Sequence, residues 1–159
     1  MGKTIAFFGH RTIFYQKDVE EKLFNLLKDK INNGYTKVIM GARGDFDSIS
    51  LQVCTKIKNT FYKDLEIIVV FTNLSCLTKK TFESNSIIDL YHKDKLITMY
   101  YEIENYHYKR RITISNQKSI DNSDLVICYV EKNCYRSGAK TAMKYALKTN
   151  KEVINLCEK

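Results

Sequence analysis

Near the start of the sequence, residues Thr4 to Arg11 read Thr-Ile-Ala-Phe-Phe-Gly-His-Arg. An apolar run that stops at a glycine is typical of the first strand of an α/β domain. Gly9 allows a sharp turn and a close approach to a ligand, and His10 and Arg11 follow at the carboxyl end of the strand. Open parallel sheets bind ligands at that edge, so we expect a phosphate-bearing small molecule there. The alternative is a simple turn with solvated side chains.

Strands and helices alternate along most of the sequence. Apolar residues at helical spacing predict four helices, at Gln16 to Asn33, around Ile49 to Ile57, at Arg111 to Asn122 and at Gly138 to Thr149. Short apolar runs predict four further strands, at Lys37 to Met40, Leu65 to Thr72, Asp124 to Val130 and Glu152 to Leu156. This alternation predicts a parallel sheet flanked by helices.

One segment breaks the pattern. Residues 73–108 are polar and aromatic without a clean period, and we expect a loop-rich insertion with a short helix near Glu83 to Leu90. Such insertions often cover a site. The length of 159 residues matches one domain, so the prediction is a single domain that carries this insertion.

The charge balance raises the question of a nucleic-acid partner. The formal net charge is +8, from 26 Lys and Arg against 18 Asp and Glu. The lysines are scattered beside acids along helix patterns, so most belong to solvated faces, and we do not expect specific nucleic-acid binding. A pocket for an anionic small molecule needs only a few of these charges.

The cysteines and the apolar runs indicate the compartment. The five cysteines are widely spaced, without a Cys-x-x-Cys pair or metal-ligand spacing, so we expect no disulfide framework, no metal and no cofactor. Cys54 and Cys128 fall on apolar patterns and are predicted to be buried, reduced thiols. No signal-peptide core is evident, and no apolar run approaches the roughly 20 residues of a membrane span. We therefore expect a cytoplasmic protein without a membrane partner.

Three turns are predicted to meet at the ligand edge of the sheet. They are Gly9 to Arg11, Gly41 to Gly44, and Ser137 to Thr141. Ser137-Gly138-Ala139-Lys140-Thr141 has the features of a phosphate cradle, because small residues allow close approach and the N–H groups and dipole of a helix start favour an anion. The alternative for this segment is a plain helix start. Asp45 or Asp47 is predicted to cap the helix after the second turn.

Several separated motifs, in the same order, resemble the YpsA-like branch of the SLOG (SMF/DprA-LOG) superfamily. They are Phe7-Phe-Gly-His-Arg11, Gly44-Asp-Phe-Asp47, Asp121 to Tyr129, and Ser137 to Thr141. The resemblance covers nearly the whole sequence. It implies one Rossmann-like domain over residues 1–159, an α/β three-layer sandwich with a mostly parallel sheet of about five strands and helices on both faces. It also implies a nucleotide-derived ligand and, because such relatives commonly self-associate, a homo-oligomer.

The resemblance also implies a departure from the enzymes of that superfamily. The LOG phosphoribohydrolases use an arginine at a helix start and a glutamate in a Gly-Gly-x-Gly-Thr-x-x-Glu motif to cleave an N-glycosidic bond. This sequence has Ser115 at the arginine position and Met143 or Lys144 at the glutamate position. Neither methionine nor lysine can act as the carboxylate. We therefore expect no catalytic residues and a protein that binds without catalysis.

Two alternatives stay open. In the first, Arg110 or Arg111 replaces the lost arginine and Asp45 or Asp47 the lost glutamate, which gives a nucleotide N-glycosidase. In the second, the protein binds single-stranded DNA as the relative DprA does, with steep salt dependence.

The favoured hypothesis is a sensor or a sequestering protein, by analogy a phage-encoded sponge for a cyclic ADP-ribose-like or cyclic nucleotide immune signal. Arg11, Arg43 and Lys140 are expected to neutralise phosphates, and an aromatic residue of the insertion to stack on the base. The predicted ligand-binding residues are Gly9, His10, Arg11, Gly41, Ala42, Arg43, Gly44, Asp45, Asp47, Ser115, Asn116, Ser137, Gly138, Ala139, Lys140 and Thr141.

Overall fold

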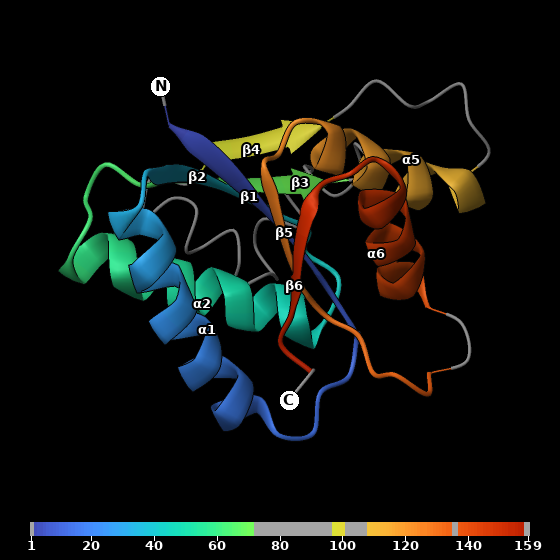
Figure 1. Ribbon diagram of the computed structural model, residues 1–159, viewed down its shortest axis with the longest axis horizontal. Coiled ribbons are helices and arrows are strands. Elements are labelled where there is room, and N and C mark those ends of the chain that lie inside the picture. The colour runs from blue at the N-terminus through green and yellow to red at the C-terminus, as the bar shows by residue number, and fades with distance from the viewer. Residues whose placement is uncertain (1, 72–96, 101–107, 135–136, 158–159) are drawn as a thin grey trace, which may run out of the picture.

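A six-stranded, wholly parallel sheet forms the centre of the protein in a computed structural model that describes residues 2–71, 97–100, 108–134 and 137–157 (Figure 1). The strand order is β4-β3-β2-β1-β5-β6. The strands are β1 (Lys3–Gly9), β2 (Tyr35–Met40), β3 (Glu66–Phe71), β4 (Ile97–Tyr100), β5 (Leu125–Tyr129) and β6 (Glu152–Asn155). The helices are α1 (Gln16–Asn32), α2 (Asp45–Thr60), α5 (Tyr108–Asp121) and α6 (Gly138–Lys148). The predicted Rossmann-like α/β sandwich is confirmed, with one strand more than the expected five.

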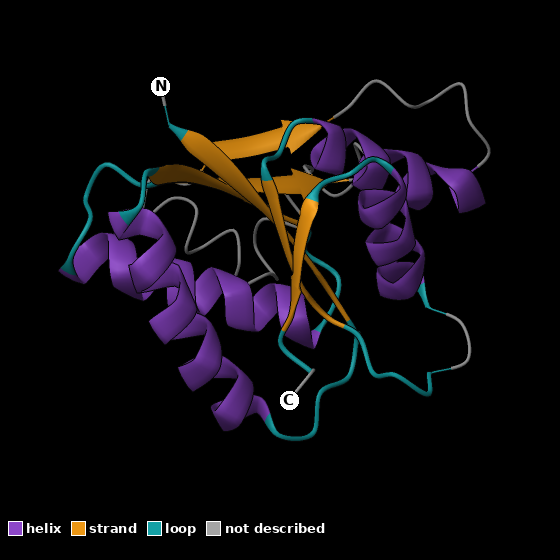
Figure 2. Cartoon of the chain, viewed as in Figure 1, coloured by secondary structure: helices purple, strands orange, loops and turns teal. Residues whose placement is uncertain are grey.

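Helices cover both faces of the sheet. In Figure 2, α1 and α2 lie on one face and α5 and α6 on the other. Successive residues of β1 point to opposite faces, so Phe7 packs in the core beneath α1 and α2, and Phe8 packs in the core beneath α6. The inner side of α6 consists of small residues, Ala139, Ala142 and Ala146, which let this helix approach the sheet closely.

The strand order reverses beside β1. This strand pairs in parallel with β2 on one side and with β5 on the other. The connection from β1 therefore runs toward β2, and the connection from β5 runs the other way, toward β6. A crevice forms between such diverging connections, at the carboxyl ends of the strands. The turns after β1, β2 and β5 all reach this edge, as the alternation of strands and helices predicts.

The segment 73–108 contains one described strand. Residues Ile97–Tyr100 form β4, which pairs with β3 from Ile68 to Phe71. The expectation of a loop-rich insertion therefore missed an edge strand. The predicted short helix near Glu83 to Leu90 lies outside the described residues.

The structure also tests the predicted buried thiols and the expected lack of a membrane span. Cys54 and Cys128 are buried and form no disulfide, as predicted, and burial raises the pKa of the Cys54 thiol. Among the helices of the described ranges, none is long and apolar enough to cross a membrane.

Helix α2 carries two buried hydroxyl groups, those of Ser50 and Thr55. Neither has a hydrogen-bond partner within the described part of the chain. An unsatisfied buried hydroxyl costs about 1–3 kcal/mol. We expect Thr55→Val, which keeps the side-chain shape, to raise the free energy of unfolding by about 1 kcal/mol in urea titrations.

The matched control is Ser123→Ala. The buried hydroxyl of Ser123 donates to the carbonyl of Ile120 at 2.8 Å. Its loss should lower the free energy of unfolding by about 1 kcal/mol. Equal destabilisation by both substitutions would contradict the prediction for Thr55.

Candidate functional site

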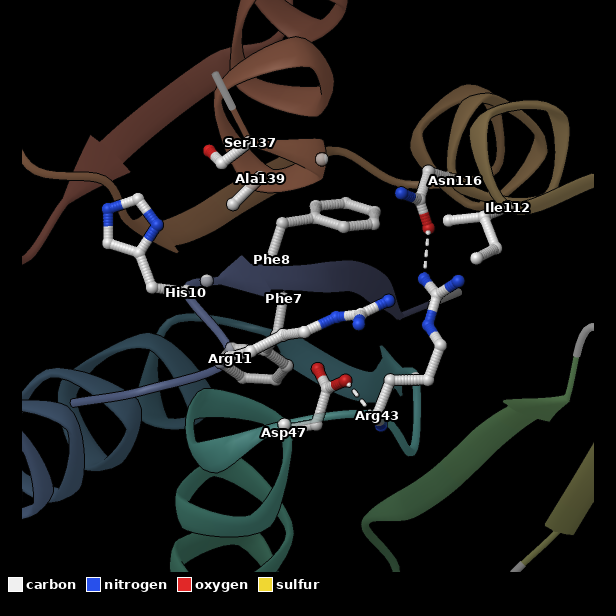
Figure 3. A pocket seen from close by; sticks show the side chains of 14 residues that line it. Phe7, Phe8, His10, Arg11, Arg43, Asp47, Ile112, Asn116, Ser137 and Ala139 are labelled. Carbon is white, nitrogen blue, oxygen red and sulfur yellow. Dashed lines mark hydrogen bonds between the residues drawn. The ribbon is translucent and has the colours of Figure 1, made fainter. Parts of the chain in front are cut away.

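A pocket of about 380 Å³ opens at the carboxyl edge of the sheet, at the reversal of strand order. Small-molecule sites occupy about 300–1,000 Å³ and favour such switch points. The turns after β1 and β2, the start of α6 and one side of α5 line this pocket (Figure 3).

Most of the predicted site residues lie in this pocket. Those that line it are Gly9, His10, Arg11, Gly41, Arg43, Gly44, Asp47, Asn116, Ser137, Gly138 and Ala139. The predicted residues outside its lining are Ala42, Asp45, Ser115, Lys140 and Thr141. The lining also includes Phe7, Phe8 and Ile112, which the sequence interpretation assigned to core or helix.

The turns after β1 and β2 are tied together. The backbone N–H of Asp45 donates to the carbonyl of Arg11 at 2.8 Å, and that of Phe46 donates to the carbonyl of His10 at 3.4 Å. Gly44 fits so closely that a Cβ atom there would lie 2.6 Å from Cα of Arg11. The first N–H groups of α2 are therefore used within the protein, and this helix start does not offer them to an anion.

The predicted capping of α2 by an aspartate is wrong. Gly44 stands at the cap position, without a side-chain hydrogen bond to the helix. The Oδ2 atom of Asp45 instead accepts the N–H of Ile13 at 2.8 Å. This carboxylate thus faces the loop before α1 rather than the pocket, and its role is to hold that loop against α2.

Gly9 does not turn the chain. It is the last residue of β1 and pairs with Tyr129 of β5. A Cβ atom at this position would lie 2.2 Å from Cγ of Phe46, a fully buried residue of α2. The missing side chain therefore makes room for the Phe46 ring.

Two guanidinium groups extend into the pocket from the two tied turns. Figure 3 shows the side chain of Arg11 directed toward Arg43, whose Nη2 donates to Oδ1 of Asn116 at 3.2 Å. Nη1 of Arg43 is buried and has no hydrogen-bond partner within the described ranges. Burial lowers the pKa of Arg43, Asp47 opposes this effect, and the like charge of Arg11 adds to it.

Arg11 and Arg43 form no salt bridge with the described residues, and the one carboxylate beside them, that of Asp47, offsets only one of their two charges. The salt bridges among the described residues, Lys30–Glu152 and Lys37–Glu66, lie on other elements. A buried guanidinium beside a second cation is electrostatically unfavourable unless an anion joins it. This end of the pocket therefore carries a net positive charge.

Asp47 lies beside the arginines but is held by the backbone. Its Oδ2 atom accepts the N–H of Arg43 at 3.0 Å, and a hydrogen bond from the N–H of Gly41 also stabilises the carboxylate. Burial raises the pKa of this carboxyl, whereas these hydrogen bonds and the Arg43 charge oppose the rise. Asp47 thus occupies the N–H groups of Gly41 and Arg43 in the second glycine turn.

The start of α6 lies across the pocket from the arginine pair (Figure 3). Oγ of Ser137 accepts the N–H of Lys140 at 3.0 Å and caps the helix. A helix start leaves its first N–H groups without intrahelical acceptors, and here Gly138 and Ala139 carry such groups and line the pocket. This helix start therefore places two N–H groups that its own turns do not use at the pocket lining.

The side chains of the cradle do not reach the pocket. Nζ of Lys140 donates to the carbonyl of Cys134 at 3.2 Å, and the hydroxyl of Thr141 donates to the carbonyl of Ser137 at 3.1 Å. The expectation that Lys140 neutralises a phosphate therefore lacks geometric support. Sequence spacing alone did not show that the preceding loop provides a closer acceptor for this ammonium.

His10 joins the first turn to the loop after β5. Its Nε2 accepts the N–H of Glu131 at 2.8 Å, which places the ring proton on Nδ1. The ring also packs edge-on against Tyr129, with centroids 6.0 Å apart. His10 therefore joins the turn after β1 to the loop after β5 at the rim of the pocket.

The positions that the resemblance matches to LOG catalytic residues do not line the pocket. Ser115 is buried on α5 and lines a small second cavity that shares Arg43 and Asn116 with the pocket. Met143 packs against the core beneath α6, and Lys144 is exposed. Among the described residues, no group of three or more His, Cys, Asp and Glu side chains is arranged to hold a metal ion.

Neither of two comparisons relates this site to a known protein. No protein-family model matches the chain. A search of curated proteins also gives no match. The site must therefore be interpreted from its own residues.

The carboxyl of Asp47 predicts a pH dependence of stability. Burial raises its folded-state pKa above the usual 3.8, so the folded protein retains the proton to higher pH than the unfolded chain. The stabilisation from this group is present below the pKa of the unfolded chain and is lost as the pH rises through the pKa of the folded protein. The free energy of unfolding of Asp47→Asn, relative to wild type, should therefore increase between pH 4 and pH 7 in urea titrations. A decrease over this interval would contradict the assignment.

Proposed function

We propose that this protein binds a nucleotide-derived small molecule through anionic groups and retains it without chemical change. The observation that carries the proposal is the pair Arg11 and Arg43, which lacks ion-pair partners among the described residues and includes a buried, unpartnered Nη1. An anion between these guanidiniums would supply the missing acceptor and relieve their repulsion.

The rest of the pocket suits the other parts of such a ligand. The N–H groups of Gly138 and Ala139 favour a second anionic group. Figure 3 shows the Phe8 ring between the start of α6 and the arginine pair, and Ile112 beside Asn116 on α5, so a base or sugar can pack on these apolar side chains. The combination of an apolar wall and a few convergent polar groups is the usual composition of a small-molecule site.

We further propose that the protein is a YpsA-like member of the SLOG superfamily that acts as a sensor or a sequestering protein for a nucleotide signal. The order of its motifs and the meeting of three turns at one edge support this proposal. Ser115 and Met143 at the positions matched to the LOG arginine and glutamate favour binding over hydrolysis.

The test is retention of an intact ligand. The full chain is incubated with nucleotides, cyclic nucleotides, cyclic dinucleotides and ADP-ribose derivatives, separated from free ligand and denatured, and the released compounds are identified by mass. Release of an unchanged compound by wild type, with much less from Arg43→Met, supports the proposal. Release of a free base or sugar phosphate would instead establish a hydrolase, and retention of nothing would overturn both.

A further inference from the structure

The arginine end of the pocket has a defined charge balance. Two guanidiniums, of Arg11 and Arg43, and one carboxylate, of Asp47, line the pocket side by side (Figure 3). In the ionised state they leave a single net positive charge. A ligand group buried there is best matched when it carries one negative charge, because residual buried charge is costly.

Asp47 is not free to leave this cluster. Its carboxylate is fixed by the N–H groups of Arg43 and Gly41. A Cβ atom on Gly41 would lie only 3.1 Å from Oδ2 of Asp47, so the turn is closed tightly around the carboxylate. A ligand phosphate therefore meets this internal anion rather than free backbone donors.

We propose that Asp47 is a specificity-determining residue that tunes the arginine end to a phosphodiester and disfavours a terminal phosphate. This inference rests on the proposed function. A phosphodiester carries one negative charge, whereas a phosphomonoester carries about 1.5 to 2 at neutral pH. The additional charge of the monoester is left without a cation and lies beside the Asp47 carboxylate, and like charges in such contact are unfavourable.

The test compares nucleotides of the same base whose phosphate is either a cyclic diester or a terminal monoester. The 3′,5′-cyclic and the 5′-monophosphates of adenosine, guanosine, cytidine and uridine are titrated calorimetrically into wild type and Asp47→Asn at pH 7.5. For the best-bound base, wild type should favour the cyclic form about tenfold or more. Asp47→Asn should reduce this ratio about tenfold, mainly through tighter binding of the monoester, since one such charge contact is worth about 1.4 kcal/mol or more.

Asp45→Asn is the matched control. Asp45 lies in the same first turn of α2, but its carboxylate faces Ile13 and Gln16 outside the pocket. This substitution should leave the ratio of the two affinities unchanged. Melting curves of each variant establish that it is folded.

The outcomes separate the two proposals. Binding of both phosphate forms by wild type with the same ratio in Asp47→Asn would overturn the role of Asp47 and leave the proposed function standing. A wild-type preference for the monoester would do the same. If none of the eight nucleotides binds wild type or Asp47→Asn, this inference is overturned. The proposed function is then tested by the mass experiment alone, and it stands if the protein retains another compound intact.

Discussion

Arg43→Met is expected to weaken binding of the retained ligand about 100-fold, because hydrogen bonds to a charged group contribute about 1.5–3 kcal/mol. The stability of the unliganded protein should change little. The substitution removes a buried Nη1 that has no partner within the described ranges and relieves the repulsion from Arg11, but it also removes the hydrogen bond to Asn116 and the positive charge beside Asp47. Calorimetry measures the affinity, and urea unfolding measures the stability.

Lys140→Met separates this effect from a general loss of positive charge. Nζ of Lys140 donates to the carbonyl of Cys134, and the residue does not line the pocket. Its replacement should change ligand affinity by less than about threefold, as expected for a distant screened charge. Equal losses from the two substitutions would show that overall charge, rather than the arginine pair, holds the ligand.

Gly9→Ala is expected to lower the free energy of unfolding by about 3 kcal/mol, the upper part of the usual range for overpacking. The added methyl would lie 2.2 Å from Cγ and 2.4 Å from Cβ of Phe46. These atoms are at the root of a fully buried side chain, so a rotation of the ring cannot relieve the overlap. Either β1 or α2 must shift, and urea unfolding reports the cost.

Gly138→Ala is the matched control for this substitution. A Cβ atom on Gly138 would meet nothing within 4 Å. Its stability should remain within about 0.5 kcal/mol of wild type, as for most surface substitutions. If Gly9→Ala were as stable as Gly138→Ala, the close approach of β1 to α2 would be disproved.

Much of the fold follows from local sequence signals. Apolar runs that end at Gly9 and Met40 predict β1 and β2, and helical spacing predicts α1 with its end at Asn33-Gly34. Gly34 indeed has a φ of +103°, a conformation that favours glycine. The edge strand β4 escaped prediction because its four residues, Ile97–Tyr100, lie in an aromatic segment without a clear period.

The site was predictable in position but only partly in detail. Three glycine turns at one edge identified Arg11, Arg43 and Gly138 as pocket residues. Local spacing did not reveal that Asp45 pairs with Ile13 or that Lys140 pairs with Cys134, since the folded loops determine those partners. Phe8 was missed because an apolar strand residue reads as core, although here it also borders the pocket.

The central place of β1 in the sheet has a consequence for how the chain matures during synthesis. β1 pairs with β5, so that Ile5 lies opposite Leu125, and one edge of β1 stays unpaired until β5 has emerged from the ribosome. Contacts of such sequence separation form slowly. The start of α6 at Gly138 and Ala139, which completes the pocket, is synthesised later still. Under the proposed function, a nascent chain therefore cannot yet bind the ligand, and the ligand stabilises only the finished fold by mass action.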